Sequence, residues 1–242
     1  MTLKVSDKVN AIRRLFEMSL EAKEIAFIYM RYSAVILRTQ KATIGIDLGK
    51  YILKKEVQAI ENLDLLLHTH GHHDHFDSQT TKDIFDLTGT NVVVEPSIAE
   101  NLQEIIPSDK LFSAHQDKRL QIDDFEINTV EGVHPCPISL YRIIYDQFDV
   151  FHGGDSGYIP LKEYPANLAF LPIGTPSPSC SPEIALKMAQ DLNSKMVIAV
   201  HGTKNQCKKF EELAKKKMSE LKVIIPNPYE SLKCSWKEIL ME

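Results

Sequence analysis

The chain has 242 residues, 43% of them hydrophobic, and a formal net charge of -5 at pH 7. This length supports a large buried core and predicts a single domain over residues 1–242, with an N-terminal helix extension over about residues 1–22. Lysine and arginine form no long basic block, which argues against nucleic-acid binding. The apolar stretches are too short to span a bilayer, and acidic residues among the first thirty do not fit a signal peptide, so we expect a cytoplasmic protein.

Helical and extended patterns follow one another in the first half of the chain. Apolar side chains at helical spacing predict an amphipathic helix over residues 6–22. An apolar strand over residues 63–67 runs directly into a histidine cluster, and Ser78 can cap a helix that begins after it. The other predicted elements are strands over residues 24–30, 33–38, 42–47 and 91–95 and a helix over residues 97–105.

The second half has a similar order of elements. Ser181 and Pro182 are a strong helix start, and a further helix buries Phe210. The predicted strands are 119–131, 139–145 and 148–152, in a mostly antiparallel sheet, with 167–171 and 195–200. Two halves of this kind predict an α/β fold with two stacked sheets and helices outside, a four-layer αββα sandwich.

The stretch "THGHHDH", residues 69–75, contains four of the nine histidines in the chain. A turn after the preceding strand can direct His70 and His72 to one metal ion, and Asp74 and His75 to a second. Imidazole and carboxylate together suit Zn²⁺, Mn²⁺ or Fe²⁺, and the absence of a cysteine nearby in sequence argues against a purely structural zinc site. Four separated cysteines without a C-x-x-C pair are interpreted as reduced core or surface residues: Cys136, Cys180, Cys207 and Cys234.

Three more candidate ligands each follow a predicted strand: His134 in "VEGVHP", Asp155 in "FHGGDSG" and His201 in "VIAVHGT". One histidine at a strand end is more often a hydrogen-bonded polar residue than a ligand. Their occurrence together with the histidine cluster favours metal binding.

The other histidines receive different interpretations. His68 is expected within a strand, His73 to point away from the metal, and His115 to lie in a polar loop. Asp47 and His152 are candidates for outer-shell partners that orient a ligand imidazole. Packing or turn roles for these two are equally open.

The pattern H-x-H-x-D-H at residues 70–75, followed by His134, Asp155 and His201, resembles the metallo-β-lactamase superfamily. "FHGGDSG", "LPIG", a Ser-Pro-Glu helix start and "VIAVHGT" resemble more narrowly the branch of metal-dependent hydrolases that includes ascorbate-6-phosphate lactonase and the phospholipase D acting on N-acyl phosphatidylethanolamines. The resemblance covers residues 24–203. The sequence departs from this branch at "MRYSAV", where a Gly-His pair is usual, and at "TPSPSCS", which replaces a glycine-rich loop.

The resemblance implies a metallo-β-lactamase fold and a binuclear metal centre with two ligand sets and one bridging carboxylate. A shared anion is also physically favourable, because two neighbouring cations repel one another. The implied first set is His70, His72 and His134, the second is Asp74, His75 and His201, and the bridge is Asp155.

The expected enzyme is a metal-dependent hydrolase that acts on a small-molecule ester, lactone or phosphodiester. Two divalent ions, Zn²⁺ first with Mn²⁺ or Fe²⁺ as alternatives, lower the pKa of a bridging water from about 15.7 toward about 7. Asp74 is the expected catalytic residue, which holds or deprotonates this water. A phosphorylated substrate calls for a basic side chain near the site, and the nearest in sequence are Arg142 and Lys204.

Two alternative functions stay open. One is a thioesterase of the hydroxyacylglutathione type, which shares the ligand set. The other is a non-catalytic metal- or ligand-sensing protein. The sequence also leaves open whether the chain forms a homo-oligomer, with the N-terminal helix as a candidate for packing or for a dimer contact.

Overall fold

The structure is a computed structural model that describes residues 3–115 and 118–240. The chain divides into two compact units: unit 1 comprises Met1–Ser113 and Asn227–Trp236, and unit 2 comprises Ala114–Pro226 and Lys237–Glu242. Each unit contains a seven-stranded sheet that is antiparallel on one side and parallel on the other. The predicted α/β class is confirmed, and a single domain over the whole chain stays a prediction.

Unit 1 has the strand order β14-β1-β2-β3-β4-β5-β6. From β3 onward the strands are parallel, and Ile46 at the end of β3 is in register with Leu67 of β4. The segments that follow β3 and β4 therefore leave the sheet at the same edge. The strands are β1 (Glu24–Arg31), β2 (Ala34–Arg38), β3 (Thr43–Ile46), β4 (Leu65–His68), β5 (Asn91–Val94), β6 (Leu111–Ser113) and β14 (Glu230–Ser235).

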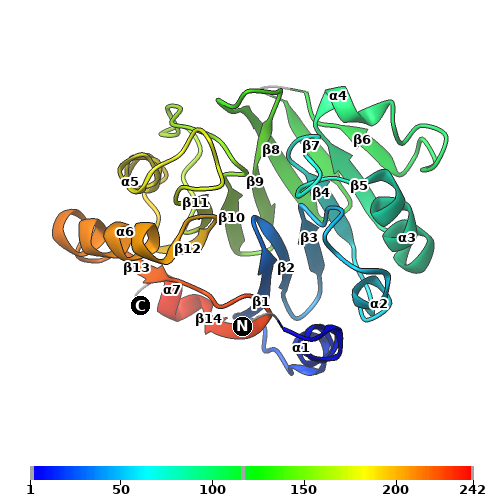
Figure 1. Cartoon of the computed structure of the whole chain (residues 1–242), viewed down its shortest axis with the longest axis horizontal. Coiled ribbons are helices and arrows are strands. Elements are labelled where there is room, and N and C mark those ends of the chain that lie inside the picture. The colour runs from blue at the N-terminus through cyan, green and yellow to red at the C-terminus, as the bar shows by residue number, and fades with distance from the viewer. Residues whose placement is uncertain (1–2, 116–117, 241–242) are drawn as a thin grey trace. The chain divides into compact units, whose positions relative to one another are not determined.

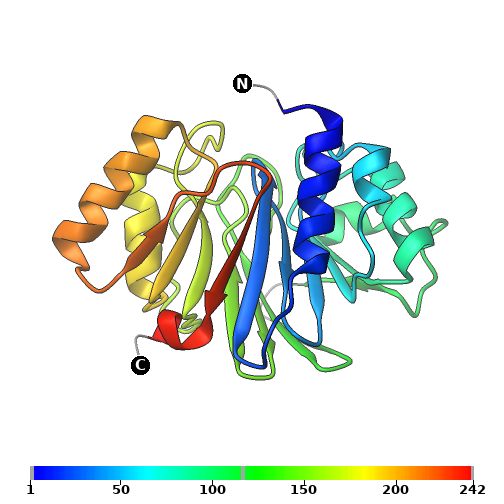
Figure 2. The same ribbon diagram turned by 90° about the horizontal axis from the view of Figure 1, so that it is seen from below.

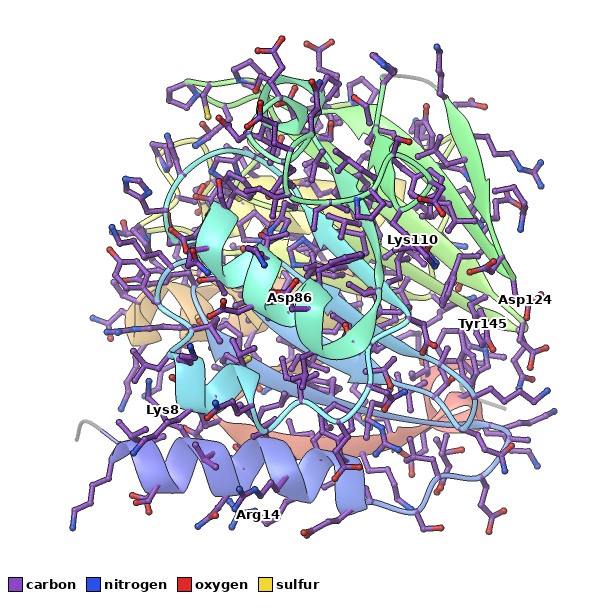
Figure 3. All side chains as sticks on the ribbon, turned by 90° about the vertical axis from the view of Figure 1, so that its right-hand side faces the viewer. Lys8, Arg14, Asp86, Lys110, Asp124 and Tyr145 are labelled. Carbon is purple, nitrogen blue, oxygen red and sulfur yellow. The ribbon has the colours of Figure 1, made fainter. Side chains whose placement is uncertain are left out.

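Helix α1 (Val5–Glu17) packs against β1, β14 and α2 (Lys54–Val57), as Figures 1 and 2 show. Its apolar face is buried, so the N-terminal helix is part of the core of unit 1. Lys8 lies on α1 beside α2 (Figure 3), with its ammonium 3.6 Å from the carboxylate of Glu56. The predicted helix over residues 6–22 ends earlier, at Glu17. Arg38 accounts for this end, because its guanidinium donates to the backbone carbonyl oxygens of Leu15 and Phe16.

Two other predicted helices in unit 1 differ from the structure. Helix α3 (Ser78–Thr88) is capped by Asp77 instead of Ser78, because the Asp77 carboxylate accepts a hydrogen bond of 2.9 Å from the Thr80 amide. The predicted helix over residues 97–105 is only the single turn α4 (Pro96–Ala99), which continues as turns. The apolar side chains of this segment are still buried in one hydrophobic cluster, which contains Ile98, Leu102 and Ile106.

Unit 2 has the strand order β13-β12-β11-β10-β9-β8-β7, with the parallel part from β10 to β13. The predicted strand over residues 119–131 is two strands, because Asp123 adopts a positive φ of 49° in a turn between them. The strands are β7 (Arg119–Ile122), β8 (Phe125–Glu131), β9 (Ser139–Tyr145), β10 (Phe148–His152), β11 (Leu168–Pro172), β12 (Met196–Val200) and β13 (Lys222–Ile224).

Two long helices lie side by side in unit 2 (Figure 2): α5 (Pro182–Asp191), which packs against β11, and α6 (Lys204–Lys217). The Ser181 hydroxyl caps α5 by accepting from the amide of Ile184, as predicted. A short helix α7 (Trp236–Leu240) follows β14. Within the described ranges, no helix combines the length and apolar character that a membrane crossing requires.

Candidate metal centre

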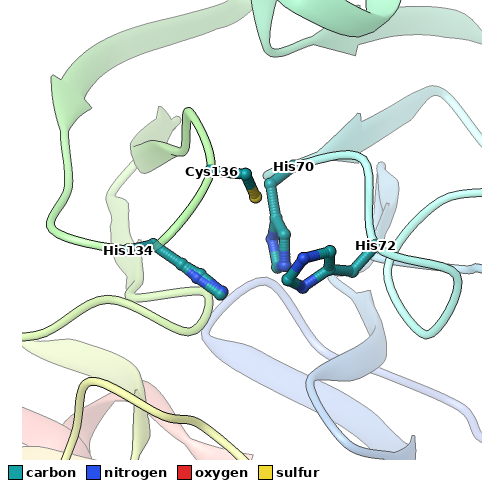
Figure 4. A group of neighbouring side chains, drawn as sticks. All are labelled: His70, His72, His134 and Cys136. Atoms are coloured by element: carbon teal, nitrogen blue, oxygen red, sulfur yellow. The ribbon is translucent and has the colours of Figure 1, made fainter.

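The loop after β4 carries the first pair of candidate ligands, His70 and His72 (Figure 4). Their ring centroids are 4.7 Å apart, and their ligand nitrogens lie within 4.8 Å of one another. His70 is buried, whereas His72 is exposed. On the buried side, Nδ1 of His70 lies 3.0 Å from the hydroxyl of Thr69. This contact fixes the ring and leaves Nε2 of His70 as the nitrogen suited to a metal.

Asp74 and His75 form a second pair on the same loop. A carboxylate oxygen of Asp74 lies 3.5 Å from Nε2 of His75. The other ring nitrogen, Nδ1, lies 2.7 Å from a carboxylate oxygen of Asp47. A carboxylate at Nδ1 favours the tautomer with its proton there, so that Nε2 carries the lone pair that a metal needs.

Asp47 is the centre of the polar network behind this loop. It directly follows β3, is fully buried and adopts a positive φ of 54°. Its carboxylate accepts hydrogen bonds from the Thr69 amide at 2.8 Å and from the Ser33 hydroxyl at 2.7 Å. The structure thus places Asp47 where an outer-shell partner of His75 would lie.

Gly49 makes a close approach to the same loop that the sequence does not reveal. A Cβ atom at this position would lie 2.7 Å from the His73 carbonyl oxygen and 2.8 Å from backbone carbons of Asp74 and His75. The next amide, of Lys50, donates to the His73 carbonyl at 2.8 Å. Because these neighbours are backbone atoms, a side chain at residue 49 requires the whole ligand loop to move.

We therefore expect Gly49→Ala to lower the free energy of unfolding by about 1–3 kcal/mol, because the added methyl group overpacks the loop. Metal binding should weaken as well. Thermal unfolding and metal titration measure the two effects. Gly89→Ala is the matched control, because Gly89 has a positive φ of 66° and a Cβ atom there would meet no atom within 4 Å. It should lose about 1–2 kcal/mol of stability, the cost of a left-handed backbone for a residue other than glycine, and keep its metal affinity. Equal metal affinity in both variants would contradict this role for Gly49.

The three histidines that were not expected to bind metal have other surroundings. His68 is buried, with Nδ1 2.8 Å from the His75 carbonyl oxygen and Nε2 3.0 Å from the Thr81 hydroxyl. Burial lowers the pKa of His68 and keeps the ring neutral. His73 and His115 are exposed.

In unit 2, Asp155 and His201 form a pair at the edge where the parallel strands end. Asp155 follows β10 and His201 follows β12; both are 3% exposed. A carboxylate oxygen of Asp155 lies 2.5 Å from Nε2 of His201. His201 adopts a positive φ of 47°, a conformation that costs energy for a residue other than glycine.

The loop after β8 carries His134 and Cys136 (Figure 4), whose ligand atoms lie within 4.8 Å of one another. Ser156 holds this loop, because its hydroxyl accepts from the Val133 amide at 2.8 Å. The interpretation of Cys136 as a simple core or surface residue missed this neighbour. The available signal was the spacing in His134-Pro135-Cys136, which puts a thiol two residues after a candidate ligand.

His152 and Arg142 have clear structural contacts in unit 2. Nδ1 of His152 accepts from the Gly154 amide at 3.2 Å, and the ring stacks on Phe170 with centroids 6.0 Å apart. These contacts fit the packing and turn interpretation of His152. Arg142 lies 3.6 Å from Asp149 across β9 and β10, so its guanidinium has a carboxylate partner within the sheet.

Comparisons with known proteins add a family and several structural relatives. The family model described as "Beta-lactamase superfamily domain" matches residues 49–202. A metallo hydrolase from the hyperthermophilic archaeon Ignicoccus hospitalis has a TM-score of 0.71 and 21% identity, over 88% of this chain and 99% of that chain. A metallo-beta-lactamase fold protein from Bacillus subtilis has a TM-score of 0.69 and 17% identity, over 87% of this chain and 99% of that chain.

A diiron beta-hydroxylase from Streptomyces venezuelae is also similar, with a TM-score of 0.68 and 12% identity, over 90% of this chain and 55% of that chain. No curated protein matches the chain. At these identities the structural likeness concerns the fold. The predicted α/β metallo-β-lactamase fold is therefore confirmed.

Proposed function

Because the chain belongs to the beta-lactamase superfamily domain family, we propose that it is a metal-dependent hydrolase with a binuclear metal centre. The observation that carries the proposal is the orientation of His75: Asp47 lies at its Nδ1, 2.7 Å away, while Asp74 lies beside Nε2. A buried histidine with a carboxylate behind it and a second carboxylate in front of it is typical of a metal ligand.

The proposed ligands fit divalent metal by their chemistry, since they are imidazoles and carboxylates. Six of them form close pairs within one unit, His70 with His72, Asp74 with His75, and Asp155 with His201, and the seventh, His134, lies beside Cys136; the ligand atoms of each pair are no more than 4.8 Å apart. When bound, the metal lowers the pKa of a coordinated water toward about 7 and polarises the substrate. In this proposal His70, His72 and His134 would hold one ion, Asp74, His75 and His201 would hold the other, and Asp155 would contact both.

Zn²⁺ is the first choice for the metal, with Mn²⁺ and Fe²⁺ as alternatives. The thiol of Cys136 beside His134 supports Zn²⁺, because a soft sulfur donor favours zinc over manganese. Iron stays an alternative because a structural relative from Streptomyces venezuelae is a diiron enzyme.

Asp74 is the proposed catalytic residue. Its side chain keeps 23% of its surface exposed, whereas its neighbour His75 is fully buried. A partly exposed carboxylate can accept a proton from water and exchange it with solvent. We infer that Asp74 orients and deprotonates the attacking water, while the buried residues hold their positions.

The proposed substrates are esters, lactones and phosphodiesters, as in the branch with ascorbate-6-phosphate lactonase that the sequence resembles. The deciding experiment is a hydrolysis screen of these classes, together with a thioester, using protein loaded with Zn²⁺, Mn²⁺ or Fe²⁺. Hydrolysis of an oxygen ester, a lactone or a phosphodiester supports the proposal, and preference for the thioester would favour the thioesterase alternative. Metal binding without turnover of any class would favour a sensing protein.

We expect each chain to bind two transition-metal ions, because seven protein ligands exceed what one ion takes while leaving room for water. Elemental analysis of protein purified without chelators, and titration of metal-free protein, measure this number. Saturation at one ion per chain would contradict the binuclear centre.

Metal affinity and activity are expected to fall together as the pH decreases below about 6.5, the ordinary pKa of histidine. Ligand histidines must be neutral to bind, so protons compete with the metal. Metal retention measured by dialysis at several pH values checks this prediction. Undiminished binding at markedly acidic pH would exclude histidine as the main ligand.

A further inference from the structure

A group of aromatic and basic side chains, all exposed except the half-buried Tyr32, borders the ligand loop of unit 1. It comprises Arg31 at the end of β1, Tyr32 in the turn between β1 and β2, and Lys50 and Tyr51 from the loop after β3; we name these four residues the tyrosine platform. The ring centroids of Tyr32 and Tyr51 are 5.4 Å apart with an interplanar angle of 38°. The Arg31 guanidinium lies over the Tyr32 ring, 5.3 Å from its centroid. Tyr51 is 46% exposed, so its ring is accessible to a ligand.

Both segments of the tyrosine platform are tied to the proposed ligands. Ser33, next to Tyr32, has its hydroxyl 2.9 Å from Nδ1 of His75. On the other segment, the Lys50 amide donates to the His73 carbonyl at 2.8 Å. The contact of Ser33 and the hydrogen bond of the Lys50 amide therefore tie both segments to the loop that carries His70 to His75.

The backbone at Tyr32 is strained, with a positive φ of 56°. Such a conformation is rare for a bulky residue and persists only where the surroundings impose it. Tyr32 lies in the two-residue turn between β1 and β2, and its ring is close to both the Arg31 guanidinium and the Tyr51 ring. Residues with a strained backbone occur more often at binding sites than elsewhere.

The two basic residues of the platform differ from Arg142, an earlier candidate for substrate recognition, in their ion pairing. Among the residues that the structure describes, neither Arg31 nor Lys50 forms an ion pair with a carboxylate, and both are exposed. Arg142, by contrast, is paired with Asp149. A guanidinium stacked on a ring keeps its in-plane N–H groups available for an anion, and phosphate oxygens match their geometry.

We propose that the tyrosine platform binds the substrate and selects an anionic phosphodiester that carries an aromatic ring. This inference rests on the proposed hydrolase function and chooses among its substrate classes. Arg31 and Lys50 neutralise the phosphodiester charge, and Tyr51 stacks on an aryl group or a nucleobase. A neutral ester or lactone gains nothing from two positive charges.

Two substrates with the same leaving group test this selection: bis(4-nitrophenyl) phosphate, which is anionic, and 4-nitrophenyl acetate, which is neutral. In Arg31→Gln we expect KM for the phosphodiester to rise about tenfold or more, as for the loss of a charge-assisted hydrogen bond, while KM for the acetate stays unchanged. Tyr51→Leu should also raise KM for the phosphodiester. Arg13→Gln is the matched control, because Arg13 is an exposed arginine on α1, and it should change neither KM.

Binding of the monoester 4-nitrophenyl phosphate, measured by calorimetry on the metal-loaded protein, gives a second readout that does not depend on turnover. Weaker binding in Arg31→Gln, and a smaller loss of affinity with added salt than in the unmodified protein, support the platform. Turnover of both substrates with equal effects of Arg31→Gln and Arg13→Gln would overturn it and leave the hydrolase proposal intact. If neither substrate is hydrolysed, the hydrolysis screen of the wider substrate classes decides the hydrolase proposal, and the calorimetric comparison separately decides whether the platform binds phosphate.

Discussion

Asp155→Asn is expected to lower hydrolysis by several orders of magnitude and to weaken the binding of one metal ion. Asp155 is the proposed bridge, so the substitution removes a negative charge where two cations would be closest. The carboxylate is also 3% exposed and lies 2.5 Å from Nε2 of His201, so its replacement leaves that ring with a weaker partner. Steady-state kinetics with parallel elemental analysis measure both effects.

The control for this substitution is His115→Ala. His115 is exposed in a loop of the same unit and is not a proposed ligand. We expect its activity and metal content to match the unmodified protein. If Asp155→Asn and His115→Ala had equally small effects, the two-metal assignment would be wrong and the metal-sensing alternative would become the better one.

Asp47→Ala is expected to reduce the free energy of unfolding by about 3–5 kcal/mol, as for a broken buried charge network. The Asp47 carboxylate accepts from Ser33 and Thr69 and lies 2.7 Å from His75, and all four residues are fully buried. Without the carboxylate, these buried donors lose their acceptor. Metal affinity should fall by about 10- to 100-fold, because the ring of His75 is no longer oriented.

Two further variants separate the causes. Asp47→Asn keeps a short polar side chain that tolerates the positive φ of 54° at this residue, so it should recover part of the stability but little of the metal affinity. Asp86→Ala removes an exposed carboxylate on α3 (Figure 3) that pairs with exposed Lys82, and should change stability by about 0.5 kcal/mol or less. Chemical denaturation and metal titration of the three variants check this order. Asp47→Ala with unchanged metal affinity would show that Asp47 serves packing alone.

Several features of this protein are determined by short stretches of its sequence. The helices α5 and α6 and most of the strands follow from apolar spacing and capping residues within about ten neighbours. The candidate ligands His70, His72, Asp74 and His75 are recognisable because they are close in sequence and follow an apolar strand. Where neighbouring residues compete for one role, as Asp77 and Ser78 do for the cap of α3, the sequence pattern is less decisive.

Other features depend on strand order, which spacing along the chain does not encode. β14 near the C-terminus pairs with β1, where Ser235 is in register with Glu24.

The residues that contact the ligand loop from behind, Asp47 and Gly49, also depend on strand order. Parallel pairing of β3 with β4 is what brings Asp47 to His75 and Gly49 to the backbone of the ligand loop. The sequence spacing places Cys136 two residues after His134, and the conformation of the loop after β8 turns its thiol toward the same side as His134. The reason is physical: local patterns report which face of an element is buried, whereas a polar network depends on which elements become neighbours, and tertiary packing decides that.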